Sequence, residues 1–147
     1  MSKQLSFVIP AHNEEEYVGK TINSIKVAML DLGAEYDITV VNDASIDKTR
    51  QVAMSHGAEV FDVDLRQIAG TRNYGAGHAA GDVIVWVDAD TLVNAALIKG
   101  VLGAVENGAI GGGCRIKFDS PAPLWGLITA VICGWFFSKF RIAEGTF

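Results

Sequence analysis

Two carboxylates one residue apart, Asp88 and Asp90, have the residue types and the spacing of a cation site. They follow Val83 to Val87, a continuous apolar run rich in β-branched side chains that is typical of a strand buried on both faces inside a parallel sheet. Open α/β sheets bind their ligands outside the carboxyl ends of such strands. Because alternate side chains of a strand point opposite ways, both carboxylates can face one ligand only if the chain turns there.

Oxygen ligands in a pair suit a hard cation, Mg²⁺ or Mn²⁺, which keeps its other positions for water and substrate phosphates. The alternative is that the two acids have no ligand and are only the polar end of a strand, followed by a helix cap at Thr91. Unit charges about 4 Å apart repel by roughly 4 kcal/mol at an effective dielectric of about 20. The two acids could therefore hold a diphosphate only through a bridging cation.

Two other predicted strands also end in acids. The run from Leu5 to Pro10 leads to Glu14, and the run from Tyr36 to Val41 leads to Asp43. In a parallel sheet the carboxyl ends of the strands share one edge. We therefore expect these acids to converge with the paired carboxylates on one crevice.

The elements that position these acids alternate along the chain. A third strand is predicted at Glu59 to Val63, and a further one at Cys114 to Phe118. Helices are predicted where apolar residues recur at helical spacing or small residues follow a start signal. They cover residues 16–32, 47–56, 70–80 and 94–106. Strand and helix in regular alternation, with short connections, predict an α/β fold, a mostly parallel sheet with helices on both faces.

Several residues are predicted to begin or end these helices. Asn13 with Glu16 has the spacing of a capping box, and Asp47 is a fair N-cap for the second helix. Gly33 and Gly57 follow the first and second helices and are expected to end them.

Composition narrows the classes of partner. The chain has 147 residues, a size that suits one domain with a real core, and its net charge is −5 with no cluster of Lys and Arg. Nucleic acid is therefore not an expected partner. Neither common phosphate-binding glycine loop is present, so phosphates must be held by a cation, by Arg66 or Arg72, or by a helix N-terminus.

The last thirty residues have a different character. From Leu124 to Phe137 a helix would be apolar nearly all round, and it is too short for a typical membrane span. We expect it to lie at a membrane surface or against a partner such as a second copy, ahead of an ordinary core helix or a true span. Cys114 and Cys133 fit neither a metal site nor a disulfide framework and are expected to be buried. No signal peptide is predicted, which favours the cytoplasm, with peripheral attachment to the inner face of the membrane.

Four motifs occur together in order: IPAHNEEEYVGKTINSI, VVNDASIDKT, the Arg-Asn pair in TRNYGAGHAAGD, and VIVWVDADT. They resemble the nucleotide-binding half of glycosyltransferase family 2. The resemblance covers about Leu5 to Phe118 and implies the Rossmann-like GT-A fold. It implies transfer of a sugar from a nucleotide-diphosphate sugar donor to a sugar, lipid-linked or other acceptor, usually with inversion and with Mn²⁺ or Mg²⁺. It divides the chain into a donor-binding domain, 1–118, and the start of an acceptor-side segment, 119–147.

The resemblance also implies roles for individual residues. Pro10 and Glu14 match positions beside the nucleoside, and Asp43 matches the acid that recognises the base. Arg72 matches a position near the diphosphate. The Asp88–Asp90 pair matches the DXD motif, with Asp90 the more dependable metal contact.

Two departures qualify the resemblance. Asn42 stands where many members carry Asp. The catalytic base of the family lies in a later segment, so no catalytic residue is predicted in this chain, and Glu144 is not expected to serve as one. A non-catalytic donor-binding module is therefore the main alternative function.

Two other enzyme classes fit less well. A sugar-nucleotide nucleotidyltransferase would carry a basic, Gly-rich loop after the first strand, and PAHNEEE has neither feature. A phosphotransferase of the haloacid dehalogenase type would carry its Asp-x-Asp motif on the first strand, and Leu92 departs from that motif.

Overall fold

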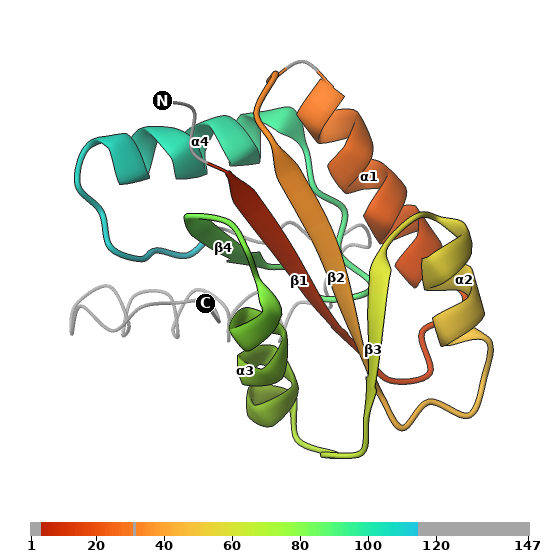
Figure 1. Ribbon diagram of the computed structural model, residues 1–147. Helices are drawn as coiled ribbons and strands as arrows, with labels where there is room; N and C mark the ends of the chain where they lie inside the picture. Colours follow the sequence, from red (N-terminus) through yellow and green to blue (C-terminus); the bar gives the residue numbers. More distant parts are fainter. Residues whose placement is uncertain (1–3, 31, 115–147) are drawn as a thin grey trace, which may run out of the picture. The chain divides into compact units, whose positions relative to one another are not determined.

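The computed structural model describes residues 4–30 and 32–114 of the chain. Within them, four strands form one parallel sheet in the order β3-β2-β1-β4 (Figure 1). The strands are β1 (Leu5–Ala11), β2 (Tyr36–Asp43), β3 (Glu59–Val63) and β4 (Val83–Trp86). All three neighbouring pairs are parallel, which confirms the predicted sheet.

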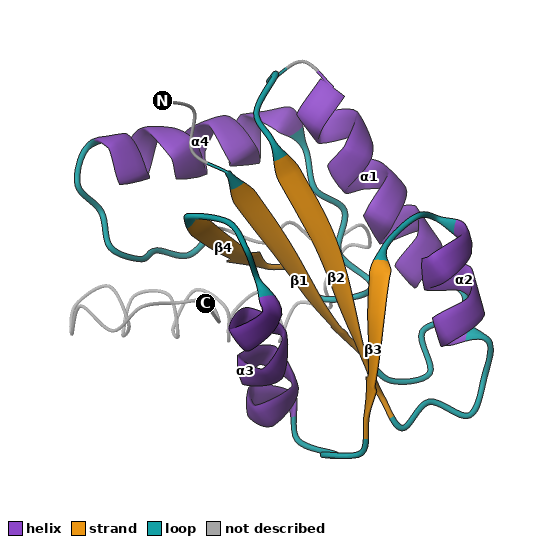
Figure 2. Ribbon diagram, viewed as in Figure 1, coloured by secondary structure: helices purple, strands orange, loops and turns teal. Residues whose placement is uncertain are grey.

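A helix follows each strand (Figure 2). These are α1 (Val18–Leu30), α2 (Thr49–Ser55), α3 (Ile68–His78) and α4 (Ala95–Glu106). Each predicted helix is present, with ends that differ by a few residues. The chain divides into two compact units, Met1–Gly103 and Ala104–Phe147, and the sheet belongs to the first. The apolar segment Leu124–Phe137, Cys133, most of the strand predicted at 114–118 and the predicted domain boundary lie outside the described residues.

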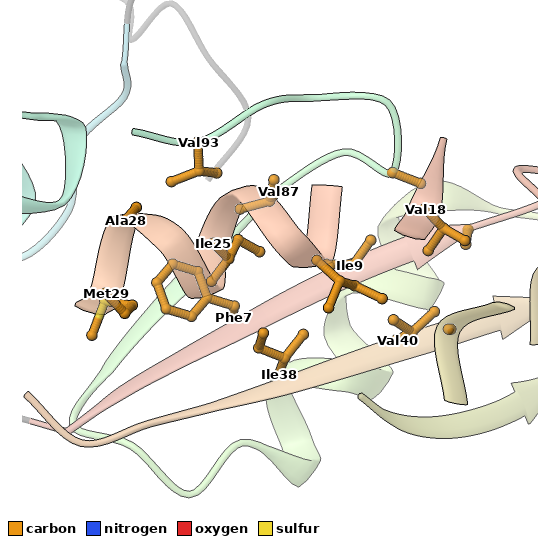
Figure 3. Packing of buried hydrophobic residues seen from close by; sticks show 14 of the residues in the cluster. Phe7, Ile9, Val18, Ile25, Ala28, Met29, Ile38, Val40, Val87 and Val93 are labelled. Carbon is orange, nitrogen blue, oxygen red and sulfur yellow. The ribbon is translucent and has the colours of Figure 1, made fainter. Parts of the chain in front are cut away.

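One face of the sheet packs against α1. Every residue of β1 is buried, and alternation sends Phe7 and Ile9 to the same face as Ile38 and Val40 of β2. Figure 3 shows these side chains meeting Ile25 and its neighbours on α1. The apolar stripe predicted on the first helix is therefore the side that covers the core.

The opposite face packs against α3 at very short range. A Cβ placed on Gly75 would lie 2.3 Å from Cγ1 of Val8 and 2.9 Å from Cγ2 of Val41. Both valines are fully buried. Only glycine lets the helix backbone come this close, so α3 is held directly on the two central strands and helices cover both faces, as predicted.

Three sequence expectations about local structure are wrong. The strand β4 is half-buried, because within the described residues it pairs only with β1 and is the outermost strand. Cys114 is exposed, because the chain from Gly108 to Cys114 forms no helix or strand. Asn13 does not cap α1, which begins at Val18. Asn13 instead stabilises a loop, since it has φ 56° and its side-chain oxygen accepts the N–H of Ile46.

The other helix ends agree better with the predictions made from the sequence. The N-cap of α2 is Lys48, one residue after the predicted Asp47, whose carboxylate still accepts the N–H of Thr49. Gly33 (φ 60°) and Gly57 (φ 75°) take the left-handed conformation and end α1 and α2, as predicted.

Candidate functional site

The carboxyl ends of the strands enclose a cleft of about 710 Å³. Its walls come from the segments that follow β1, β2 and β4 and from the loop between β3 and α3. The lining residues are Pro10, Ala11, His12, Asn13, Glu14, Asp43, Ala44, Ile46, Arg66, Gln67, Ile68, Thr71, Asp88, Ala89 and Asp90. The convergence expected from the parallel topology is therefore present.

Asp88 and Asp90 lie on a turn. A turn was expected, because successive side chains of an extended strand would point to opposite faces. The N–H of Thr91 donates to the carbonyl of Asp88 at 3.0 Å, and Ala89 is buried in the core at 4% exposure. With the middle residue pointing inward, both flanking carboxylates border the cleft. Asp88 is 46% exposed, which leaves it open to solvent and to a cation.

Two hydroxyl groups of α1 hold this turn, and sequence reasoning missed both. The buried Thr21 donates from Oγ1 to the carbonyl of Ala89 at 2.7 Å. Ser24 accepts the N–H of Val93 at 2.9 Å. Polar residues on the core face of an amphipathic helix were the available signal, because a buried hydroxyl needs a partner.

The loop after β1 and the loop after β2 are joined by side-chain hydrogen bonds to backbone N–H groups. The hydroxyls of Ser45 and Thr49 accept the N–H groups of Asn13 and Glu14, at 2.9 and 2.7 Å. The bonds run in the other direction as well, since the Glu15 carboxylate accepts the N–H of Lys48. This reciprocal pairing fixes one wall of the cleft and the backbone that carries Glu14.

Glu14 lies in a negative environment. Partial burial, then the nearby charge of Asp90 and that of Asp47, raise the pKa of its carboxyl above the usual 4.5, against a smaller lowering by His12. Acids brought together in this way repel one another. A divalent cation in the cleft would relieve that repulsion.

Asp43 is 6% exposed and accepts four hydrogen bonds. Its Oδ1 accepts the N–H groups of Leu65 (2.7 Å) and Arg66 (3.0 Å), and its Oδ2 accepts the N–H of Gln67 (3.3 Å) and the hydroxyl of Thr71 (2.9 Å). Burial works to raise the pKa of this carboxyl, but these donors outweigh it and hold the pKa below its usual value. Asp43 is therefore charged when the protein is folded at neutral pH.

Arg72 does not line the cleft but lies behind it. It is 9% exposed and its Nη2 donates to Oδ1 of Asp88 at 2.6 Å. Its Nε is buried and has no hydrogen-bond partner among the residues that the structure describes. Within the described residues, the other cationic candidate, Arg66, lines the cleft and is paired with the exposed Asp64. All the other predicted site residues line the cleft.

The acidic side chains of the cleft suit one kind of metal site. Across residues 4–30 and 32–114, no three His, Cys, Asp or Glu side chains gather as a ready metal site. Asp88 and Asp90 provide two accessible carboxylates on one turn, and Mg²⁺ is usually held by one or two carboxylates plus substrate phosphates. The residues present therefore fit a cation whose coordination a phosphorylated ligand completes.

Each of the three histidines packs or hydrogen-bonds within the protein. His12 lines the loop after β1 and its Nδ1 contacts the carbonyl of Asp43. His56 ends α2 with its ring against Gly19, and His78 stacks on Tyr74 at the surface of α3.

In the described part of the chain, no helix is long and apolar enough to cross a membrane.

This fold defines an α/β protein with a cleft at the carboxyl edge of a parallel sheet, the edge where open α/β sheets bind ligands, and with a paired-carboxylate turn in that cleft. Comparison with known protein families identifies the family. The model of glycosyl transferase family 2 matches residues 6–145. The chain belongs to this family.

Relatives with curated names are similar over most of this chain. The 4,4'-diaponeurosporenoate glycosyltransferase of Staphylococcus aureus is 34% identical over 122 aligned positions, and the match covers 71% of this chain. The matched part is 31% of that protein. This chain therefore spans about a third of the length of the curated relatives it matches.

Solved structures share the fold. Glucosyl-3-phosphoglycerate synthase of Mycobacterium tuberculosis aligns with a TM-score of 0.59 at 25% identity, covering 72% of this chain and 41% of that one. The same enzyme in complex with Mn²⁺, uridine diphosphate and glucosyl-3-phosphoglycerate aligns at 26% identity, with a TM-score of 0.57 and coverages of 70% and 39%. TarS of S. aureus, at 23% identity and a TM-score of 0.63, covers 82% of this chain and 41% of its own. These likenesses confirm the GT-A fold.

Proposed function

We propose that this chain is the donor-binding part of a glycosyltransferase, which binds a nucleoside-diphosphate sugar through Mn²⁺ or Mg²⁺. The observation that carries the proposal is the turn at the carboxyl end of β4. It presents Asp88 and Asp90 to a cleft that Glu14 and Asp43 also border. Membership of the family and the sugar-transfer names of the relatives agree with this reading.

In this proposal Asp90 is the principal cation contact, because it is exposed and no described residue makes a hydrogen bond or ion pair with its carboxylate. Asp88 is the second contact, and Arg72 orients it. A bound divalent cation would neutralise the negative charge that develops on the nucleoside diphosphate as the glycosidic bond breaks. Arg72 adds a fixed positive charge behind the same point, at 2.6 Å from Asp88.

In this proposal the nucleoside lies in the part of the cleft lined by Pro10, Glu14 and Asp43, together with residues 66–68. Uracil is the base we propose, because the mycobacterial synthase at 25–26% identity was solved with uridine diphosphate and either Mn²⁺ or Mg²⁺. The cleft volume of about 710 Å³ lies in the range of small-molecule sites.

Transfer to a sugar, lipid-linked or other acceptor, with inversion, is the full activity we propose for the protein to which this domain belongs. No described residue is assigned as the catalytic base. The second candidate function is accordingly a donor-binding module without transfer activity of its own. In either case the segment Leu124–Phe137 would associate with a membrane surface at the cytoplasmic side or with a second copy.

A thermal-shift titration tests donor binding. The chain is heated with uridine, guanosine or thymidine diphosphate, each with Mn²⁺ or with a chelator. Ligand at a hundredfold excess over its dissociation constant stabilises the fold by about 2.7 kcal/mol. We expect a shift with uridine diphosphate and Mn²⁺ that disappears in Asp90→Ala and persists in the control Glu59→Gln, whose exposed carboxylate is outside the cleft.

If no nucleotide shifts the unfolding temperature, the donor-binding proposal is refuted. If one does, incubation of a sugar-labelled donor with the chain separates the two candidate functions. Release or transfer of the sugar supports a transferase, and donor binding without any release supports the module.

A further inference from the structure

We propose that Ile46 and Ile68 form an apolar rim of the cleft, which packs against the faces of the donor's nucleobase. This inference rests on the proposed function and names two further contact residues of the same site. The sequence motifs and the family resemblance assign no role to either residue. Both are large aliphatic side chains that line the cleft and are exposed, Ile46 at 93% and Ile68 at 59%.

The two isoleucines come from different loops that meet at Asp43. Ile46 follows Asp43 closely, in the loop after β2. Ile68 opens α3 directly after Gln67, whose N–H donates to Oδ2 of Asp43 at 3.3 Å. All three of Ile46, Ile68 and Asp43 line the cleft. The rim therefore borders the part of the cleft that we assign to the nucleoside.

The exposure of Ile46 is set by the conformation of its loop. Its N–H donates to Oδ1 of Asn13 at 2.8 Å. Ala44 has φ 53°, in the left-handed region that non-glycine residues seldom adopt, and its N–H donates to the carbonyl of Val63 at 2.8 Å. These bonds to two other segments fix the backbone that presents Ile46. A ligand would therefore meet an apolar side chain whose backbone is already ordered, which lowers the entropy cost of binding.

The charges of the cleft decide which part of the donor meets the rim. In the proposed function, Asp88 and Asp90 take the cation and the diphosphate. Aliphatic carbon cannot replace the water around a diphosphate, so the rim does not suit the charged part of the ligand. A nucleobase is uncharged and has two planar faces, and aliphatic side chains gain free energy when such a face covers them. The rim therefore fits the nucleobase, at the place where the resemblance puts its recognition by Asp43.

Contact with the face of a base carries no hydrogen-bond pattern. Each base has such a face, whereas discrimination between bases depends on polar groups at their edges. The rim should therefore add affinity to uracil and cytosine nucleotides alike. It should add nothing to a ligand that has the diphosphate and lacks the base.

Four variants of the full chain test the rim. Ile46→Ala and Ile68→Ala each shorten an exposed side chain, so the fold should be retained, and thermal unfolding checks this. Ile46→Leu keeps the apolar bulk. Val27→Ala is the matched control, because Val27 is also aliphatic and β-branched, is 65% exposed and lies outside the cleft.

The first readout observes the contact itself. The δ1 methyl groups of isoleucine are labelled with ¹³C, and NMR spectra are recorded with uridine diphosphate and the diamagnetic Mg²⁺. We expect nuclear Overhauser effects from H5 or H6 of uracil to the methyl groups of Ile46 and Ile68. We expect none to Ile22 and Ile25, which are fully buried. Saturated binding without an effect at either rim methyl group would overturn the proposal.

The second readout is the dissociation constant, measured by calorimetry for uridine diphosphate, cytidine diphosphate and inorganic pyrophosphate, each with Mg²⁺. We expect Ile46→Ala and Ile68→Ala to weaken both nucleotides about five- to tenfold, because a base that covers half of the removed carbons loses that contact. Pyrophosphate has no base, so its dissociation constant should not change. Ile46→Leu and Val27→Ala should stay within about twofold of the wild type for every ligand.

The contrary results can be told apart. Unchanged nucleotide affinity in both alanine variants would overturn the rim and leave donor binding intact. An equal loss for pyrophosphate and uridine diphosphate would also overturn it, since the substitutions would then disturb the whole cleft. If the wild-type chain binds neither nucleotide, the proposed function fails and the rim fails with it.

Discussion

The close approach of α3 to the sheet makes a strong prediction about Gly75. A methyl group added there would meet Val8 Cγ1 at 2.3 Å and Val41 Cγ2 at 2.9 Å, where ordinary contact begins at 3.4 Å. Both neighbours are buried and β-branched, so their side chains have few rotamers to move into. The helix must therefore shift by about 1 Å, an overpacking that costs about 1–3 kcal/mol.

Gly77 supplies the matched control in the same helix. A Cβ there would meet no atom of the described residues within 4 Å. Replacing an exposed helical glycine by alanine stabilises a helix by about 0.5–1 kcal/mol, with less near the helix end. The two substitutions share this gain in helix propensity, so their difference isolates the contact with the sheet.

Urea unfolding followed by circular dichroism measures both variants. We expect Gly75→Ala to lower the free energy of unfolding by about 1–2 kcal/mol after the propensity gain is included. Gly77→Ala should raise it slightly. If both variants are stabilised alike, α3 does not lie directly on β1 and β2, and the packing described above is wrong.

Three further predictions concern the site and its supports. Because burial, Asp90 and Asp47 raise the pKa of Glu14, its charge costs stability as pH rises from 4.5 through the folded pKa. Glu14→Gln should therefore increase the free energy of unfolding more at neutral pH than at 4.5, and an equal effect at both would contradict this. Thr21→Val leaves the buried carbonyl of Ala89 unpaired and should cost about 1–3 kcal/mol and weaken Mn²⁺-dependent nucleotide binding. Thr21→Ser, which keeps the donor, should retain binding, and similar binding by both variants would refute a role for this hydroxyl. Gly19→Ala puts a Cβ 2.8 Å from the His56 ring. It should destabilise the fold less in a His56→Ala background, by at least about 0.5 kcal/mol in a double-mutant cycle, whereas additive effects would show that the ring moves freely.

The sheet and the place of the site could be predicted from the sequence, because both depend on local patterns. Apolar runs such as Val83–Val87 mark strands, and parallel topology then sends the acids that follow them to one edge. The burial of β4 could not be predicted, since an apolar run does not reveal whether a strand has one neighbour or two. The Asn13 and Glu16 spacing also misled, because Asn13 turns to the next loop, and only the folded chain brings Ile46 within its reach.

The hydrogen-bond partners of the polar residues around the site could not be predicted from the sequence either. Asp43 meets donors 22 to 28 residues away, and Thr21 meets a carbonyl 68 residues away. Arg72 was expected near the diphosphate, and in the structure its partner is the carboxylate of Asp88. Such pairings depend on how helices dock on the sheet. A close backbone approach such as that of Gly75 sets that docking, and periodicity does not encode it.

The most direct test of the donor site is to locate the cation. Mn²⁺ is paramagnetic and broadens the NMR signals of nearby amides, so a ¹⁵N-labelled chain with uridine diphosphate and substoichiometric Mn²⁺ reports where the ion binds. We expect the strongest broadening at residues 88–91, weaker broadening at residues 11–14 and 43–44, and loss of both in Asp90→Ala. Broadening centred on any other part of the chain, or unchanged in Asp90→Ala, would contradict a cation held by the paired carboxylates.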